Sequence, residues 1–182
     1  MAANVVQEVQ AHHFSDKDRL FLDANVWLLL YGPVASYRQK EAAAYSRALR
    51  DALMVGSAVH VDVLVMSEFV NRYARMEQRR SSRFQRADFK AYRSDPEFVP
   101  VARAICKEAR RIAGHVKCCA SSFADSDVQA TLAAFESGQS DFNDLVIAQT
   151  CAQNGLVLIT DDADFAGAGI QILTANLRLL NA

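Results

Sequence analysis

Carboxylates gather at two places in the second half of the sequence, at spacings that suit metal chemistry. The first group is Asp141 and Asp144, and the second is Asp161, Asp162 and Asp164. Carboxylates within about 4 to 6 Å of one another repel unless a cation lies between them. Hard oxygen ligands suit Mg²⁺ or Mn²⁺, and both ions can activate water for phosphodiester hydrolysis. The two groups therefore indicate metal-assisted hydrolysis, provided that folding brings them together.

Each of these acids also has an ordinary structural explanation. Asp141, or Ser140 before it, is a good N-cap for a helix that ends at Gly155, and Asp144 shares the face of its first turn. Asp161 suits the start of a turn. The chemical hypothesis rests on the combination of acids.

Two earlier acids join the hypothesis if the elements around them position them. Asp23 directly follows the apolar run 20–22, as expected of a buried strand and the residue after it. Glu68 lies in a helical segment that starts at Asp62 or at Ser67. The apolar residues between those two positions also suit an extension of the preceding strand, and this choice decides where Glu68 points.

Apolar runs and helical periodicities alternate along the chain. Strands are expected near 20–22, 58–61, 156–159 and 170–173, and helices in the segments that end near Gly56, Met76, Gly114, Gly138 and Gly155. This alternation predicts an α/β fold with a central parallel sheet. Functional groups of such sheets gather at the carboxyl ends of strands, where Asp23 and Asp162 are expected.

The middle of the chain has the most one-sided run of charge. Eight residues within 72–93 are arginine or lysine, against only two acids. Five arginines recur at spacings of three and four, namely Arg72, Arg75, Arg79, Arg83 and Arg86. On a continuous helix they would line a basic stripe that suits RNA phosphates, and a solvated face or a protein contact is the alternative. For the interleaved Phe84, Phe89 and Tyr92, helix packing is favoured over base stacking.

Length and composition limit the remaining choices. The chain has 182 residues, 51% of them apolar, and a formal charge of −1, so we expect one domain over residues 1–182 and only local contact with nucleic acid. Residues 1–19 read as a polar leader without the apolar core of a signal peptide. No apolar run reaches the roughly 18 residues of a membrane span, so a cytoplasmic protein is expected.

Four segments in the same order resemble the PIN-domain family, and in particular VapC-type toxin ribonucleases. They are LDANVW with Asp23, SEFVNR with Glu68, DFNDLVIAQTCAQNG with Asp144, and LVLITDDADF with Asp162. The last two segments are the most specific. The resemblance implies a three-layer α/β/α sandwich with a central parallel sheet.

The resemblance also implies a catalytic and metal-binding set. Asp23, Glu68, Asp144 and Asp162 would surround Mg²⁺ or Mn²⁺, and a metal-activated water would hydrolyse RNA. The supporting residues would be Asn25 beside Asp23, Thr160 orienting Asp162 or a water, Asp164 as an auxiliary acid, and Asp141. The implied partners are RNA, a cognate antitoxin protein and a second copy of the chain in a homodimer.

Two departures and two alternatives accompany this interpretation. The polar leader and the long arginine-rich middle, residues 72–117, depart from compact toxins. One alternative is a PIN-like scaffold that binds RNA or protein without cleaving. The other is a phosphatase of the haloacid-dehalogenase type, which is disfavoured because Asn25 stands where those enzymes place a second acid.

Overall fold

A single parallel sheet organises the computed structural model, which describes residues 5–138 and 140–182. The strand order within these residues is β1-β6-β5-β2-β3-β4, and every neighbouring pair is parallel. The strands are β1 (Val5–Glu8), β2 (Arg19–Leu22), β3 (Ala58–Val61), β4 (Lys117–Cys118), β5 (Val157–Ile159) and β6 (Gln171–Thr174). The predicted α/β fold with a central parallel sheet is confirmed.

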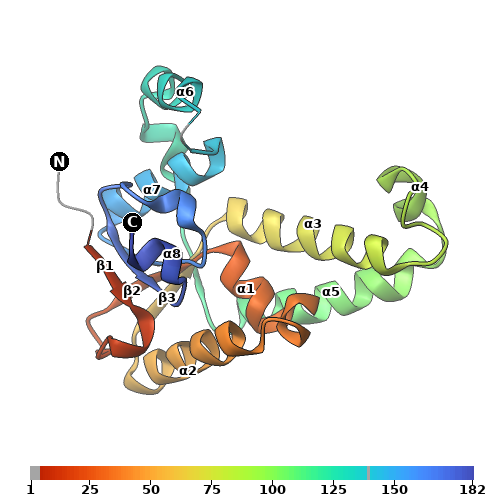
Figure 1. Cartoon of the computed structure of the whole chain (residues 1–182), viewed down its shortest axis with the longest axis horizontal. Coiled ribbons are helices and arrows are strands. Elements are labelled where there is room, and N and C mark those ends of the chain that lie inside the picture. Colours follow the sequence, from red (N-terminus) through yellow and green to blue (C-terminus); the bar gives the residue numbers. More distant parts are fainter. Residues whose placement is uncertain (1–4, 139) are drawn as a thin grey trace.

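Helices connect the strands and cover the sheet (Figure 1). The α-helices are α1 (Ala24–Tyr31), α2 (Gln39–Val55), α3 (Val63–Arg80), α4 (Phe89–Ser94), α5 (Phe98–Ala113), α6 (Val128–Glu136), α7 (Phe142–Asn154) and α8 (Leu177–Leu180). Short 3₁₀ helices are η1 (Val9–Ala11), η2 (Pro33–Ser36), η3 (Ser122–Asp125) and η4 (Ala163–Phe165). Among the described residues, no helix combines the length and the apolar character that crossing a membrane requires.

The central strands are apolar because both of their faces are covered. Leu20, Phe21 and Leu22 of β2 are buried, as are Leu158 and Ile159 of β5. Such strands appear in the sequence as short continuous apolar runs, and their positions could therefore be predicted from it. Gly56 and Gly155 end α2 and α7 in the left-handed conformation, with φ of 87° and 59°, as glycine at a helix C-terminus commonly does.

The expectation that residues 1–19 form only a polar leader is wrong. Val5–Glu8 is the edge strand β1 and pairs with β6 in the register Val6 to Ile172. This strand has no apolar run because it lies at the edge of the sheet, where Val5 is 54% exposed. Further along, Ser57 Oγ donates to the Ser15 carbonyl oxygen (2.6 Å), which fastens the following loop to the body.

The arginine-rich middle forms an arm that extends from the body (Figure 1). We define the basic arm as residues 72–111. In it α3 and α5 pack side by side, and α4 closes the far end. Phe84 and Tyr92 are buried there, with ring centroids 5.3 Å apart, so these aromatic side chains pack within the arm, as predicted.

The predicted continuous stripe of five arginines is wrong. Helix α3 ends at Arg80, so Arg83 and Arg86 lie in the turn that follows and do not continue its face. Gln78 holds this turn, because its Nε2 donates to the carbonyl oxygens of Phe84 (3.2 Å) and Ala87 (2.8 Å). Burial of the Phe84 ring at the tip favours the turn over another helical turn.

Candidate active site

Asp23 and Asp162 follow the two adjacent strands at which the strand order changes direction. From β2 the chain continues to β3 and β4 on one side, and later returns to β5 on the other side of β2. Ligands of open α/β sheets bind at such switch points, outside the carboxyl ends of the strands. Asp23 directly follows β2, and Thr160 directly follows β5.

Asp23 is held rigidly at this point. It is only 4% exposed, and its Oδ2 accepts hydrogen bonds from Thr160 Oγ1 (2.8 Å) and Asn25 Nδ2 (2.7 Å). Its Oδ1 accepts from the Ala24 backbone N–H (2.5 Å). These partners come from the start of α1 and the end of β5, so they fix the carboxylate between the two central strands.

Thr160 and Asn25 also position the chain that leads to Asp162. The Thr160 hydroxyl oxygen accepts from the Asp162 backbone N–H (3.0 Å), and Asn25 Oδ1 accepts from that of Asp161 (3.1 Å). Asp162 Oδ1 in turn accepts from the Asp164 backbone N–H (3.1 Å). The Asp164 side chain is exposed and begins a 3₁₀ turn.

Two acids approach from neighbouring helices. Asp62 caps α3 by accepting from the Val65 backbone N–H (2.9 Å), so the helix begins before Glu68, and Glu68 lies in its second turn. Asp141 caps α7 by accepting from the Phe142 backbone N–H (2.9 Å), which leaves Asp144 in the first turn.

Burial and the charges of neighbouring acids raise the pKa values of two of these aspartates. Burial raises the pKa of Asp144 to about 7, and the charges of Asp23, Asp162, Asp141 and Glu68 add to this effect. Burial likewise raises the pKa of Asp23 to about 6, against the hydrogen bond from Thr160, and Glu68 and Asp162 contribute repulsion. Five carboxylates from four elements therefore act on one another electrostatically.

A divalent cation fits the chemistry of this donor set. All the donors are carboxylate oxygens, which Mg²⁺ and Mn²⁺ prefer, and a cation would relieve the repulsion that raises both pKa values. Within the described parts of the chain, no three His, Cys, Asp or Glu side chains already converge as a complete metal-binding group. Mg²⁺ keeps several waters and takes one or two protein carboxylates, so a site of this kind does not require such a group.

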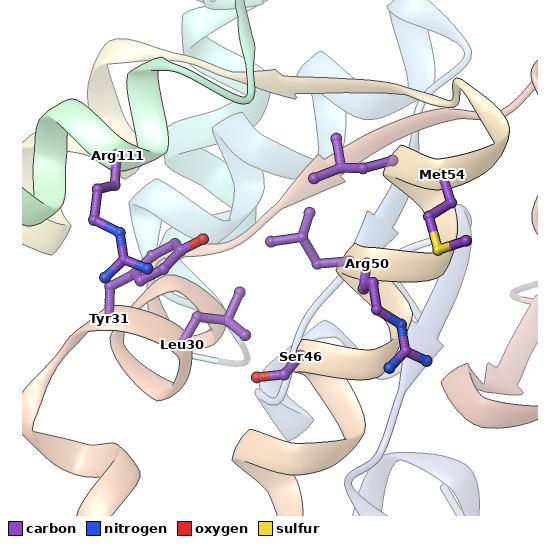
Figure 2. A pocket seen from close by; sticks show the side chains of 8 residues that line it. Leu30, Tyr31, Ser46, Arg50, Met54 and Arg111 are labelled. Atoms are coloured by element: carbon purple, nitrogen blue, oxygen red, sulfur yellow. The ribbon is translucent and has the colours of Figure 1, made fainter.

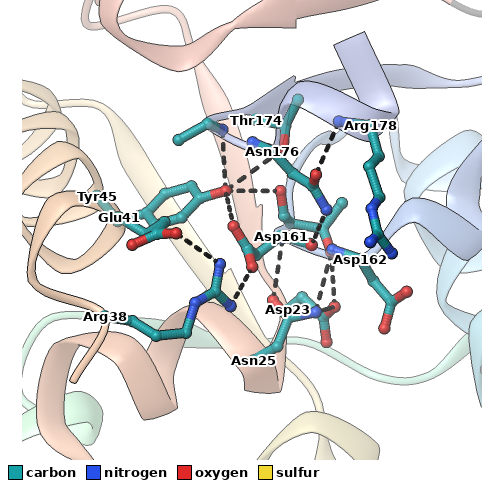
Figure 3. A network of polar contacts seen from close by, with 12 residues as sticks. Asp23, Asn25, Arg38, Glu41, Tyr45, Asp161, Asp162, Thr174, Asn176 and Arg178 are labelled. Carbon is teal, nitrogen blue, oxygen red and sulfur yellow. Dashed lines mark hydrogen bonds and ion pairs between the residues drawn. The ribbon is translucent and has the colours of Figure 1, made fainter. Parts of the chain in front are cut away.

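A polar network that was not predicted from the sequence lies next to the site and holds the segment that contains Asp161. Asp161 is 8% exposed, and its Oδ2 forms an ion pair with Arg38 Nη1 at 2.6 Å (Figure 3). The Tyr45 hydroxyl lies 3.0 Å from Asp161 Oδ1, and Asn176 Nδ2 donates to the Asp161 carbonyl oxygen (2.6 Å). Arg38 and Asp161 are 123 positions apart, and no local motif in the sequence indicates their pairing.

Replacing Arg38 with Met should destabilise the protein by about 2 kcal/mol, because it leaves the buried Asp161 carboxylate without its cation. Chemical denaturation at neutral pH measures this loss. Arg47→Met on the exposed face of α2 is the matched control and should change the free energy of unfolding by less than about 0.5 kcal/mol. Equal effects of the two substitutions would show that the ion pair contributes nothing.

A cavity elsewhere contains none of the predicted site residues. It lies between α1, α2 and α5, and its lining includes Leu30, Tyr31, Met54 and two arginines, Arg50 and Arg111 (Figure 2). The Arg111 guanidinium lies over the Tyr31 ring, 4.6 Å from its centroid. The chemistry of the carboxylates, and not this cavity, identifies the candidate site.

A parallel α/β sheet with carboxylates at its switch point defines the class of protein. Residues 20–170 match the PIN domain family, and the chain therefore belongs to that family, whose fold is of the nuclease type. The crystal structure of PAE2754 from Pyrobaculum aerophilum is similar over 96% of this chain and 95% of that chain, with 14% identity and a TM-score of 0.48. No curated protein matches the chain.

Proposed function

We propose that this protein is a divalent-metal-dependent endoribonuclease. The observation that carries the proposal is that Asp23 and Asp162 follow the adjacent strands β2 and β5, and that their charges and that of Glu68 add to burial in raising the pKa of Asp144. Carboxylates with raised pKa values cluster at functional sites, and a bound cation would relieve their repulsion. Membership of the PIN-domain family supports phosphodiester hydrolysis as the reaction at this site.

Different residues would surround Mg²⁺ or Mn²⁺ and orient the carboxylates that do so. Asp23, Glu68, Asp144 and Asp162 would surround the ion and its waters, while Thr160 and Asn25 keep the Asp23 carboxylate oriented. When bound, the ion would activate water and stabilise the charge that develops on the phosphate. Asp141 caps α7 and adds negative charge beside Asp144.

A cleavage assay on a mixed RNA pool tests the proposal. The natural protein should cleave with Mg²⁺ or Mn²⁺ and lose activity with chelator, and Asp23→Asn should be inactive with either ion. Cleavage by Asp23→Asn at the natural rate would contradict the proposal. Hydrolysis of small phosphomonoesters without RNA cleavage would instead indicate a phosphatase, and retained RNA binding without turnover would indicate a scaffold.

The charge distribution supports RNA as the substrate. The basic arm carries 12 arginine or lysine residues and five acidic residues, whereas the rest of the chain carries 8 and 16. On α3 the positions of Glu68, Arg72, Arg75 and Arg79 recur at intervals of four, three and four, and so share one helix face. Phosphates that follow this face would meet cations on the way from the carboxylates to the arm tip.

Replacing Arg79, Arg86 and Arg93 together with Gln should weaken the binding of long RNA. All three are exposed, and their side chains form no ion pair with the described residues. The slope of log affinity against log salt should fall by about 0.7 for each lost phosphate contact with a single strand. Fluorescence anisotropy over a salt series measures both effects. An unchanged slope, equal to that of the Arg47→Gln control, would show that these arginines of the basic arm do not contact RNA phosphates.

A further inference from the structure

Two hollows flank the Asp162 turn, and they differ in charge. One hollow is lined by Asp144, Asp164, Phe165 and residues of α7, and none of its lining residues is basic. The other lies toward α3 and α8 and has a volume of about 440 Å³. Its lining includes three aspartates, Asp161, Asp162 and Asp164, and three arginines from different parts of the fold, namely Arg38, Arg72 and Arg178. We call this second hollow the arginine cavity.

The three arginines are not equally engaged. Arg38 binds Asp161 and Glu41 (2.6 and 3.0 Å), and Arg72 Nη1 binds Glu68 Oε1 (2.8 Å). The guanidinium of Arg178 forms no hydrogen bond or ion pair with any described residue, although Asp162 and Asp164 line the same cavity. Figure 3 shows Arg178 and Arg38 on opposite sides of the segment with Asp161 and Asp162. Arg178 therefore offers its donors to a ligand.

The side-chain amide donors of the cavity are already engaged. Asn25 Nδ2 donates to Asp23, and Asn176 Nδ2 donates to the Asp161 carbonyl oxygen (2.6 Å). Asn176 Oδ1 accepts from the Arg178 backbone N–H (2.9 Å), which fixes the start of α8 next to the cavity. The unused side-chain donors of the cavity are thus those of its arginines, and they suit an anion with several oxygens, for which arginine is the preferred ligand.

We propose that the arginine cavity binds the phosphate of the RNA chain next to the one that is hydrolysed, with Arg178 as its main contact. This inference rests on the proposed function, because the carboxylates around Asp162 would define where hydrolysis occurs. Of the two hollows only the arginine cavity has cations in its lining, so it would also give the bound strand a direction. Arg178 is thus a specificity-determining residue, and its replacement should leave the carboxylates in place.

Direct binding of short single-stranded oligoribonucleotides tests the inference. Binding is measured in the Asp144→Asn background, so that the RNA stays intact. Arg178→Ala should weaken binding about tenfold, the effect of losing a hydrogen-bonded charged contact, and Arg47→Ala should leave it unchanged. Both arginines are exposed, so neither substitution should impair folding. Equal affinities of the two variants would overturn the inference.

Neutral methylphosphonates identify the phosphate that is bound. Replacing one particular phosphate should weaken binding by the protein with Arg178 about tenfold and have no further effect on Arg178→Ala, because the same contact is already lost. If the methylphosphonate and Arg178→Ala have additive effects on the binding free energy at every phosphate position, the inference is overturned. A second pair of oligonucleotides, with a terminal phosphate or a terminal hydroxyl, distinguishes a chain end from an internal phosphate, and either source supports the cavity as a phosphate site.

The two proposals can fail separately. If the natural protein cleaves RNA but Arg178→Ala binds and cleaves like Arg47→Ala, the phosphate site is wrong and the nuclease stands. If Arg178 couples to one phosphate but the natural protein never cleaves, the nuclease is wrong and the phosphate site stands. In an active protein, Arg178→Ala should raise KM about tenfold with little change in kcat, since the lost contact lies outside the reacting group.

Discussion

Asp144→Asn is expected to lower RNA cleavage at saturating Mg²⁺ by about a thousandfold or more, the scale on which residues that act as a catalytic unit fail. Burial raises the pKa of Asp144, and the charges of Asp23, Asp162, Asp141 and Glu68 raise it further, so a bound cation would stabilise its carboxylate. Asn keeps the size of the side chain and removes its charge. The initial rate of cleavage of a labelled RNA, for the variant and the natural protein, measures the loss.

Asp141→Asn is the matched control for this prediction. Asn is as good an N-cap as Asp, so α7 should start unchanged, and cleavage should fall by at most about tenfold. Thermal unfolding shows that both variants are folded. Equal losses at positions 141 and 144 would mean that general negative charge at the start of α7 matters, and that Asp144 has no particular role in holding the ion.

The stability of the metal-free protein is expected to fall as the pH rises from about 4 to about 8. The pKa of Asp23 is raised from 3.8 to about 6, and that of Asp144 is raised to about 7. Between the ordinary and the raised values the folded protein binds more protons than the unfolded chain, so stability decreases with pH in that window. For Asp23 alone, the loss at pH 8 is about 3 kcal/mol.

Thermal unfolding in chelator over this pH range measures the loss. Mg²⁺ or Mn²⁺ should restore stability, and more strongly at pH 8 than at pH 5, because the ion competes with protons for the same oxygens. Asp144→Asn should be more stable than the natural protein in chelator at pH 8 and should respond less to the ion. A metal-free protein whose stability rises through this window would contradict the raised pKa values.

The sequence predicts the centre of the fold better than its edges. The buried strands β2, β3 and β5 read as short apolar runs because helices cover both faces of the sheet, and the acids after β2 and β5 are therefore located correctly. Strand β1 is exposed at both ends and follows no apolar pattern, and its partner residues in β6 are 166 positions away in the sequence. Helix α1 is apolar nearly all round, so helical periodicity does not reveal it.

Long-range contacts explain the remaining differences at the site. The Arg38 to Asp161 ion pair and the Tyr45 hydroxyl network join segments that only the folded sheet brings together. Spacing alone predicted a stripe of five arginines, but burial of Phe84 and the hydrogen bonds of Gln78 end α3 at Arg80. The acids were predicted because strand ends and helix caps are local signals, whereas the residues that support them are not.

Anomalous scattering from Mn²⁺ in crystals of the natural protein tests the central claim most directly. We predict one or two manganese peaks in contact with carboxylate oxygens of Asp23 and Asp144, and no peak there in Asp144→Asn crystals grown in the same way. Manganese bound only at other acids, with Asp23 and Asp144 free of it at saturating concentration, would contradict a divalent-metal site at this edge of the sheet.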